Sequence, residues 1–555
     1  MYISGYVPFG SGGIIIRVET DIRRGIPGID ISGLPDGAVK EARERVRAAF
    51  RNSGLAFPLD RVLINLAPAG VKKEGAALDL PIALSVMAAA GLVPGMAALP
   101  EGLMVLGELE LSGRVRPVRG TLAAAAAGLR EGIRFYMVPK ENGAEAAILL
   151  DRGEEEGGAA QFCAVSSLEE AAHALVLLTK EGALPLPFPG GSRPAREDGG
   201  DGPDPGEAGA WGDFAEVQGQ SRYKRALEIA AAGGHNLLVF GPPGSGKTLL
   251  ARRFPSIMAP LTREEAVEVT RIYSIAGQLP GGAALIARPP FRAPHHSASA
   301  EGILGGGRMV RPGEISLAHL GALFLDEAPE FRAPVLQALR EPLEDRRLTI
   351  VRAEGPALLP ADFQLLMAAN ACPCGALGGP GECFCTPEEI RRYWRKFGAA
   401  LLDRVELRVP GGGPAVWAGP GDSAGEEFPG PGEAPAESSA VIRRRVIRAV
   451  EIQRRRFAAV SPRGEAGGRP RRNARIGPGR IGEFCPLTEG AERALRRGTE
   501  RLGLSGRARH GVLKTARTIA DLEGEETARI GEDHILEALQ HRRLGDDPRD
   551  ALYVE

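Results

Sequence analysis

The chain has 555 residues, too many for a single hydrophobic core, so two or three domains are expected. Its formal net charge of −1 excludes a uniformly basic, nucleic-acid-coating protein but leaves local basic patches open. Only 6 cysteines occur in this length, which argues against a disulfide scaffold and favours a cytoplasmic location.

No signal peptide or membrane span is predicted. No early segment combines a basic start, an apolar stretch and a small-residue cleavage site. The most apolar stretch, 76–93, is interrupted by Asp79 and Pro81 and is rich in alanine. A buried helix is therefore favoured over a membrane span, and no membrane partner is expected.

The first part of the chain reads as a mixed α/β domain followed by a linker. Residues 1–184 alternate strand-like runs, such as Gly13–Val18 and Val62–Leu66, with helical runs, such as Ala38–Arg51 and Thr121–Leu129. Residues 185–212 are rich in proline, glycine and acidic side chains and have almost nothing to bury. They are predicted to be a flexible linker.

Two further domains are predicted beyond that linker. Residues 213–410 alternate short apolar strands with helices, as an α/β domain does. Residues 411–439 are again rich in Gly, Pro and Glu and are predicted to be a flexible insert. Residues 440–555 are helical in pattern and dense in arginine.

A phosphate-binding loop follows the apolar strand Asn236–Phe240. It consists of Gly241, Pro242, Pro243, Gly244, Ser245, Gly246, Lys247 and Thr248, which match G-x-x-x-x-G-K-[ST], and a helix is predicted after it at Leu249–Phe254. Its glycines let backbone N–H groups surround phosphate, Lys247 neutralises β/γ oxygens, and the Thr248 hydroxyl binds Mg²⁺. The setting between strand and helix favours an ATP–Mg²⁺ site over a chance glycine-rich turn.

Two later strands end in residues suited to nucleotide hydrolysis. Ala322–Leu325 ends in Asp326 and Glu327, which fit a metal-site carboxylate and a base that orients the attacking water. Phe363–Ala369 ends in Asn370, whose amide suits a bridge between the γ-phosphate and that water (sensor 1). Each could alone be a solvated strand end or a turn residue, but downstream of a phosphate loop the hydrolytic interpretation is favoured.

A cysteine cluster follows Asn370. Cys372 and Cys374 precede Cys383 and Cys385 by eleven residues, first to first. Four thiolates in one short loop suit a tetrahedral structural Zn²⁺, although C-x-C is tighter than the common C-x₂-C spacing. Free thiols remain the alternative.

Three long motifs carry a family resemblance. FRAPHHSAS from Phe291, RPGEISLAHLGALFLDEAPEF from Arg311, and NACPCG from Asn370 resemble the ComM/YifB group of magnesium-chelatase-like AAA+ ATPases. The resemblance implies an α/β P-loop AAA+ core, a helical C-terminal lid, and a homo-oligomeric ring, usually a hexamer, with ATP between subunits. The family's Asn-Pro is Asn370-Ala371 here, and its Ser-Gly-Pro is replaced within 397–400.

The resemblance also assigns two arginines. The segment 401–404 resembles the one carrying the arginine finger, so Arg404 is expected to reach a neighbouring subunit's γ-phosphate. A local salt bridge with Asp403 or Glu406 is the alternative. The segment 504–510 resembles the start of the sensor-2 helix, which favours Arg507 over Arg509 as the residue that senses nucleotide.

The first domain resembles the Lon-protease fold, an α+β domain, but lacks its nucleophile. The resemblance rests on Gly33–Asp36, Lys73–Asp79 and the stretch from Gly107 to Gly120. A Lon-type site needs a serine activated by a lysine. Aligning Lys73-Glu-Gly75 puts Ala77 at the serine position, and no lysine follows Gly120 in the next helix, so no peptidase chemistry is expected.

Two functions stay open for the motor. A DNA motor, such as the branch-migrating helicase of natural transformation implied by ComM, is favoured by two features. The first is a set of arginines that could neutralise phosphates, namely Arg443, Arg444, Arg445, Arg448, Arg454, Arg455, Arg456, Arg469, Arg471, Arg472 and Arg475. A solvated helix face explains the same charges equally well.

The second feature is a predicted hairpin. Residues 348–355 lie between two strand-like stretches, where related ring helicases carry a hairpin that enters the pore, and Arg346, Arg347 and Arg352 would contact DNA there. The alternative function is a chelatase-type or protein-remodelling ATPase subunit that works with a separate partner.

Overall fold

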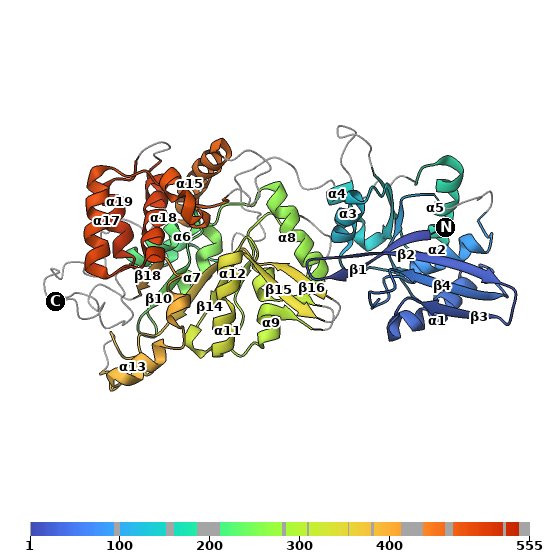
Figure 1. The fold of residues 1–555 in the computed structure, drawn as a ribbon, viewed down its shortest axis with the longest axis horizontal. Coiled ribbons are helices and arrows are strands. Elements are labelled where there is room, and N and C mark those ends of the chain that lie inside the picture. The colour runs from blue at the N-terminus through green and yellow to red at the C-terminus, as the bar shows by residue number, and fades with distance from the viewer. Residues whose placement is uncertain are drawn as a thin grey trace.

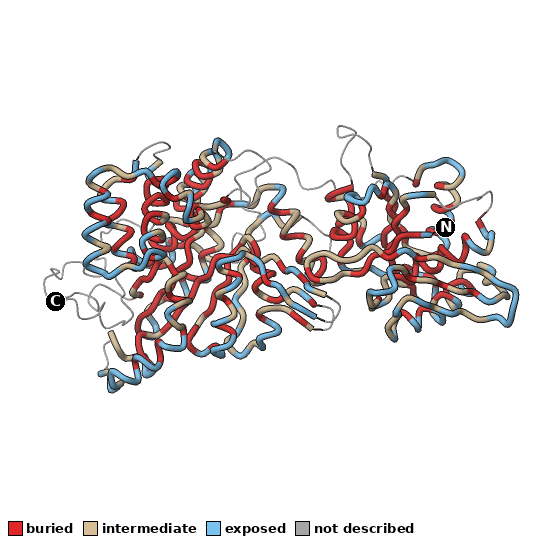
Figure 2. The backbone as a smooth tube through the Cα atoms, viewed as in Figure 1, coloured by how far each residue is buried: buried red, intermediate tan, exposed pale blue. Residues whose placement is uncertain are grey.

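The computed structural model forms an elongated molecule, with the N-terminal domain at one end and the C-terminal helices at the other (Figure 1). In Figure 2, buried residues follow the sheet strands and the inner faces of the helices. None of the helices within the described part of the chain is both long and apolar enough to cross a membrane. The described residues are 2–93, 100–150, 160–185, 211–279, 285–307, 310–352, 355–378, 382–411, 437–460, 470–524 and 529–542.

The N-terminal domain is built on a mixed sheet in the order β3-β4-β2-β1-β5-β8-β9. Its strands are β1 (Tyr2–Phe9), β2 (Gly12–Arg23), β3 (Gly28–Ser32), β4 (Arg61–Ala67), β5 (Leu103–Val105), β8 (Phe135–Pro139) and β9 (Gln161–Val165), with the small pair β6 (Glu108–Leu109) and β7 (Val115–Arg116). Its helices are α1 (Gly37–Asn52), α2 (Asp79–Ala89), α3 (Thr121–Arg130), α4 (Gly143–Leu150) and α5 (Leu168–Glu181). The strands and helices expected here are confirmed, and the apolar stretch around α2 is a buried helix.

The central domain is a parallel sheet in the order β11-β14-β17-β10-β18. Its strands are β10 (Leu237–Phe240), β11 (Phe291–Arg292), β14 (Ala322–Leu325), β17 (Gln364–Ala369) and β18 (Leu407–Pro410). Every residue of β10, β14 and β17 is buried. Such continuous apolar strands are typical of a sheet covered on both faces.

Helices cover both faces of this sheet (Figure 1). The central helices are α6 (Ser221–Gly233), α7 (Lys247–Arg253), α8 (Arg263–Ala276), α9 (Ala300–Leu304), α10 (Glu314–Leu317), α11 (Ala333–Ala338), α12 (Arg340–Asp345), α13 (Pro387–Trp394) and α14 (Ala399–Leu402). The lid helices are α15 (Ser439–Val460), α16 (Ile481–Phe484), α17 (Glu489–Leu502), α18 (Gly506–Glu523) and α19 (Glu532–Gln540). The lid shares one hydrophobic cluster with α6 and the sheet, so the two domains pack as neighbours.

Most of each predicted flexible segment, residues 186–210 and 412–436, lies outside the described residues. At their described ends, the Trp211 ring packs edge-on against Phe291, with 5.7 Å between centroids, and α15 already begins at Ser439.

The predicted hairpin is present, but its strands were misplaced by the sequence prediction. A small pair, β12 (Gly305–Gly306) with β13 (Arg311–Pro312), precedes it, and β15 (Arg347–Arg352) pairs antiparallel with β16 (Gly355–Pro360). Residues 348–352, expected to connect two strands, are therefore part of the first strand. The β-branched run Thr349, Ile350 and Val351 favours this extended conformation.

Arg346 does not belong to the exposed part of the hairpin, contrary to the prediction. It ends α12 with a φ of +58°, and its Nη2 donates to the carbonyl of Arg475 at 2.8 Å. Burial lowers its pKa, with the positive charge of Arg475 adding to the effect. It therefore contacts the lid, whereas Arg347 and Arg352 are exposed.

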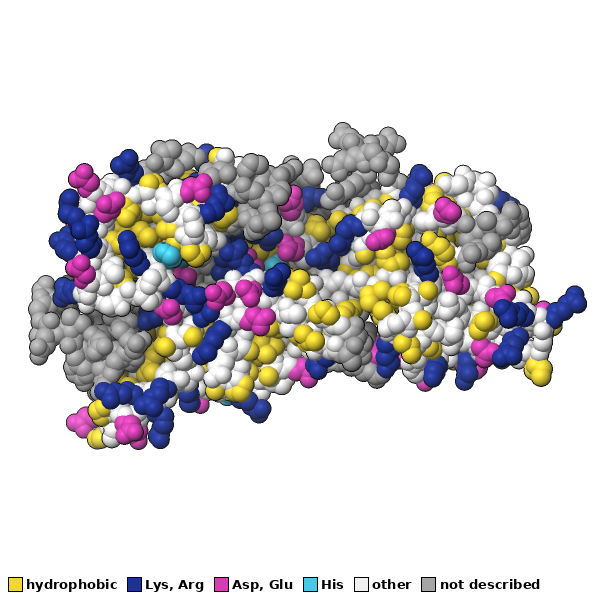
Figure 3. Space-filling view, viewed as in Figure 1, with side chains coloured by type: hydrophobic (Ala, Val, Ile, Leu, Met, Phe, Trp, Pro, Cys, Tyr) yellow, Lys and Arg dark blue, Asp and Glu magenta, His cyan; other side chains and the backbone are white. Residues whose placement is uncertain are grey.

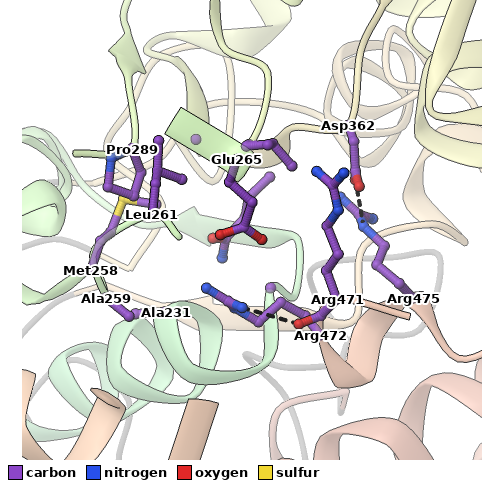
Figure 4. Close-up of a pocket in the computed structure, with 14 residues that line it drawn as sticks. Ala231, Met258, Ala259, Leu261, Glu265, Pro289, Asp362, Arg471, Arg472 and Arg475 are labelled. Atoms are coloured by element: carbon purple, nitrogen blue, oxygen red, sulfur yellow. Dashed lines mark hydrogen bonds and ion pairs between the residues drawn. The ribbon is translucent and has the colours of Figure 1, made fainter. Parts of the chain in front are cut away.

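Many of the arginines predicted to contact DNA instead form ion pairs with carboxylates of the same chain. Arg471 pairs with Glu268 and Arg475 with Asp362, each at 2.8 Å, at the cavity between core and lid shown in Figure 4. Further pairs join Arg445 to Glu228, Arg454 to Glu265, and Arg456 to Asp521. On the face shown in Figure 3, basic and acidic side chains are interspersed over the C-terminal helices.

Some of the remaining arginines of that set stay exposed on α15, namely Arg444, Arg448 and Arg455, and Arg469 lies outside the described residues. The arginine density of the last domain therefore serves lid packing in large part, a role that neither sequence interpretation had included.

A buried carboxylate joins the N-terminal domain to the central one. Glu145 accepts hydrogen bonds from the Leu122 amide at 2.7 Å, from Asn142 at 2.9 Å and from the Ser274 hydroxyl of α8. Its burial raises its pKa, and these donors oppose that shift. The Gly120 amide also donates to the Ser274 carbonyl, at 3.2 Å.

Replacing Glu145 with alanine is expected to weaken this junction. The change leaves the buried Leu122 amide without its acceptor and should reduce the free energy of unfolding by about 2 kcal/mol. Glu145→Gln keeps an acceptor oxygen and is the matched control. Thermal unfolding of the full chain measures the effect, and equal stability of the alanine variant and the wild type would contradict it.

Candidate functional site

The candidate nucleotide cleft lies at the carboxyl edge of the central sheet. Strands β10, β14 and β17 are parallel neighbours, so the phosphate loop, Asp326-Glu327 and Asn370 emerge side by side from it. These are the sequence-predicted residues that the structure brings together. The cleft is lined by Pro243, Gly244, Ser245, Gly246, Lys247, Thr248, Leu249, Asp326, Glu327, Ala368, Ala369 and Asn370.

The phosphate loop has a backbone that its glycines make possible. Gly244 and Gly246 have φ values of +76° and +75°, a backbone conformation that residues with a Cβ atom rarely adopt. Helix α7 begins directly after Gly246, at Lys247, two residues before the predicted start. Its amino end therefore faces the cleft, where backbone N–H groups and the helix dipole favour an anion.

Lys247 is held inside the loop by oxygen atoms. Its Nζ donates to the carbonyls of Gly241 at 2.9 Å and Pro242 at 2.6 Å, and lies 3.5 Å from Oδ1 of Asn370. Burial lowers its pKa to about 8, and the nearby Asp326 carboxylate opposes that shift. Lys247 thus lies between the phosphate loop and the end of β17.

The candidate metal ligands already contact each other. The Thr248 hydroxyl donates to Oδ2 of Asp326 at 2.9 Å, and the Glu327 amide donates to Oδ1 at 3.0 Å. A hydroxyl and a carboxylate placed together are the oxygen donors that Mg²⁺ uses beside nucleotide phosphates. The residues present therefore fit an ATP–Mg²⁺ site.

Glu327 points out from this edge. It has a φ of +48°, uncommon for a residue with a side chain, and its side chain is 62% exposed. Nδ1 of His296 lies 3.6 Å from its Oε2. His296 comes from the FRAPHHSAS motif, yet the sequence prediction gave it no role, because nothing in the sequence placed that loop beside β14.

The start of helix α6 and the residue before it support the phosphate loop, which the sequence prediction also missed. Nε2 of Gln220, the residue before α6, donates to the Ser245 carbonyl at 2.9 Å, and the Tyr223 hydroxyl of α6 donates to the Lys247 carbonyl at 3.2 Å. Tyr223 is buried, so this contact is part of the core. No local motif indicated either residue.

Arg404 and Arg507 lie together, but away from the cleft of their own chain. Both donate to the carboxylate of Glu344, Arg507 at 2.7 Å. Hydrogen bonding to Arg404 is the main cause that lowers the pKa of Glu344. Neither arginine lines the cleft, and the local partner of Arg404 is Glu344 rather than Asp403 or Glu406.

The four clustered cysteines also come together. Their Sγ atoms all lie within 4.8 Å of one another. Cys372 is buried, Cys383 and Cys385 are half-buried, and Cys374 is exposed. The cluster begins two residues after Asn370, next to the cleft.

In the Lon-like domain the residues around Ala77 have structural contacts. Asp79 is buried and paired with Arg45 through bonds of 2.7 and 2.9 Å, and it accepts the Leu109 amide at 3.3 Å. Burial raises the pKa of Asp79 to about 6, although Arg45 opposes this shift. The absence of peptidase activity stays a prediction from Ala77.

A parallel sheet with a phosphate loop at its carboxyl edge, adjoining acidic and amide strand ends, and a helical lid defines a P-loop ATPase of the AAA+ class. Three family models match the chain: "Magnesium chelatase, subunit ChlI" over residues 213–411, "Subunit ChlI of Mg-chelatase" over 18–142, and "Magnesium chelatase, subunit ChlI C-terminal" over 436–542. The chain belongs to the ComM/YifB family of magnesium-chelatase-like AAA+ ATPases.

Relatives match along almost the whole length. The chain is 38% identical over 529 residues to the uncharacterized protein YifB of Escherichia coli, covering 95% of this chain and 94% of YifB. It is 36% identical over 530 residues to the competence protein ComM of Haemophilus influenzae, covering 96% and 95%. A shorter match of 146 residues, at 29% identity, is to the Lon protease of Salinispora arenicola and covers 25% of this chain and 18% of the protease.

The lowered pKa of Lys247 predicts how nucleotide binding depends on pH. Phosphate oxygens favour the charged lysine, so binding should raise this pKa and take up a proton where the lysine was neutral. Affinity for ATP should therefore be flat below pH 8 and fall above it, by up to about tenfold per pH unit. Lys247→Arg, always charged, should give a flat profile. Equal slopes for the two proteins in a fluorescent-nucleotide titration would contradict the assignment.

Proposed function

We propose that the protein is a ring-forming motor that hydrolyses ATP to act on DNA. The contact between Thr248 and Asp326 carries the ATPase part of this proposal, because it joins the phosphate loop to the carboxylate of the neighbouring strand. Bound Mg²⁺ would supply positive charge beside the transferred phosphoryl group. Lys247 would exchange its carbonyl partners for phosphate oxygens.

Two further side chains would direct the water. Glu327 is exposed at the cleft and would orient the attacking water by accepting its proton. Asn370, close to Lys247, would donate its amide to the γ-phosphate or to that water. These roles require only side-chain movements at the edge of a rigid sheet.

The positions of Arg404 and Arg507 support a ring. Hydrolysis of ATP needs a positive charge close to the γ-phosphate in the transition state. Arg404 and Arg507 instead bind Glu344, outside the nucleotide cleft of their own chain. We propose that both act on the nucleotide of a neighbouring subunit. Each site would then be incomplete without a second copy, and the family resemblance favours a hexamer.

The β15–β16 hairpin supports a polymer substrate. Arg347 and Arg352 are both exposed. Val351 beside Arg352 is 75% exposed and Leu358 on the paired strand is 48% exposed, so the hairpin presents apolar side chains next to its cations. Cations flanking an apolar side chain suit a nucleic-acid backbone, and the ComM resemblance favours DNA, with branch migration in recombination as the finer expectation.

A chelatase-type or protein-remodelling subunit is the second candidate. The family-model descriptions favour it, since all three name a magnesium chelatase subunit. The internal pairing of many lid arginines also removes part of the charge argument for DNA. The exposed hairpin cations are then the feature that separates the two candidates.

Mixed rings test the proposed action between subunits. Arg404→Ala should bind ATP normally but hydrolyse it about a thousandfold more slowly, as expected for loss of an arginine finger. Glu327→Gln should bind and not turn over. Mixing the two should restore part of the activity, because an intact Arg404 can meet an intact Glu327 at shared interfaces. No recovery in rings shown by mass to be mixed would overturn action in trans.

DNA stimulation tests the proposed substrate. Single-stranded, duplex and four-way DNA should raise the ATPase rate at low salt, and Arg347→Ala/Arg352→Ala should weaken that response by about tenfold or more without changing the basal rate. Arg444→Ala/Arg448→Ala removes the same charge from α15 and should respond like wild type. A wild-type protein that no DNA binds or stimulates would favour the chelatase-type alternative.

A further inference from the structure

The cysteine cluster has the dimensions of a cage for one ion. The Sγ atoms of Cys372, Cys374 and Cys383 are separated by 3.3, 3.6 and 3.7 Å. A disulfide requires about 2.05 Å, so none of these pairs is a disulfide. Four thiolates around one tetrahedral zinc, each about 2.3 Å from it, lie about 3.8 Å apart. The three observed separations match that arrangement, and Sγ of Cys385 lies within 4.8 Å of the other three sulfurs.

The loop backbone is shaped to present these sulfurs. Gly375 has a φ of +80°, and its N–H donates to the Cys372 carbonyl at 3.1 Å, closing a tight turn. The Leu377 N–H then donates to Sγ of Cys372 at 3.3 Å. Backbone N–H groups directed at sulfur stabilise thiolates, the form that binds metal. The turn also explains how the short C-x-C spacing still brings both thiols inward.

We propose that Cys372, Cys374, Cys383 and Cys385 bind one structural Zn²⁺ that fixes the loop after Asn370 against the phosphate loop. Each thiol loses its proton to solvent as its sulfur–zinc bond forms. All four tetrahedral positions are filled by sulfur, so no position is open for substrate or water. A cluster of several irons would need a wider cage, because its irons and sulfides lie between the cysteines.

The position of the cage gives the ion a second role, one that rests on the proposed ATPase. A Cβ on Gly375 would lie 3.2 Å from Cδ of Pro243, so the turn packs directly on the phosphate loop. Nε1 of Trp394 donates to the Ala371 carbonyl at 3.0 Å, and α13, which carries this tryptophan, begins two residues after Cys385. Zinc would thus tie Asn370, the phosphate loop and α13 into one rigid unit.

Metal analysis of the full-length protein, purified under reducing conditions, tests the site. Mass spectrometry should find about one zinc per chain. Cys374→Ser/Cys385→Ser should lose it, whereas Cys163→Ala/Cys485→Ala, which removes two buried cysteines elsewhere, should keep it. Exchange of cobalt into wild type should give the absorption of a tetrahedral tetrathiolate site, a readout that needs no variant to fold.

Each alternative result is decisive for one part of the proposal. Wild-type protein without metal, in which all four thiols react with a thiol reagent in the native state, would overturn the site. One iron in place of zinc would overturn the identity of the metal. The zinc-free variant should retain ATP but turn it over about tenfold more slowly, because Asn370 is misplaced. Zinc loss with unchanged turnover would overturn the link to Asn370 and leave the ATPase intact.

Discussion

The central constraint in this molecule is that three parallel strands end side by side. The hydrogen bond from Thr248 to Asp326 spans from the start of α7 to the end of β14, and Lys247 lies near the end of β17. Each contact depends on strand pairing that places Leu366 opposite both Leu237 and Phe324. A slip of one residue would move the side chains of the slipped strand to the opposite face of the sheet and shift its end relative to the neighbouring strand ends. Burial on both sheet faces therefore determines the geometry available for phosphate chemistry.

Contacts outside this edge connect the core to the lid and to the N-terminal domain. Arg404 of the core and Arg507 of the lid both bind the carboxylate of Glu344, so displacing one arginine changes the hydrogen bonding of the other. On the opposite side, the Ser11 hydroxyl of the N-terminal domain donates to the Leu358 carbonyl of β16 at 2.7 Å, and Phe9 packs on the hairpin cluster. The Lon-like domain is thus in contact with the element proposed to grip DNA, which gives that domain a physical connection to the motor.

Local signals in the sequence were sufficient for the strands and for the phosphate loop. The apolar runs before Gly241 and Asp326 predicted two strands, and the buried strands β10 and β14 confirm them. The nucleotide-binding role of the residues that follow these strands stays a prediction. The sequence could not show partners distant along the chain. Glu344 carries no motif, yet it joins Arg404 and Arg507, and Gln220 supports the phosphate loop from the position before α6, where no motif marks it. The lid arginines were misjudged for the same reason, because their carboxylates lie far away in sequence.

The proposed chemistry requires ATP at the edge formed by these strands, with one divalent ion beside Thr248 and Asp326. A structure of Glu327→Gln with ATP and Mn²⁺, with the ion located by its anomalous scattering, tests this most directly. We expect the ion next to the Thr248 hydroxyl and the γ-phosphate within hydrogen-bonding distance of Lys247 and Asn370. Nucleotide bound elsewhere, or an ion remote from Thr248 and Asp326, would contradict it.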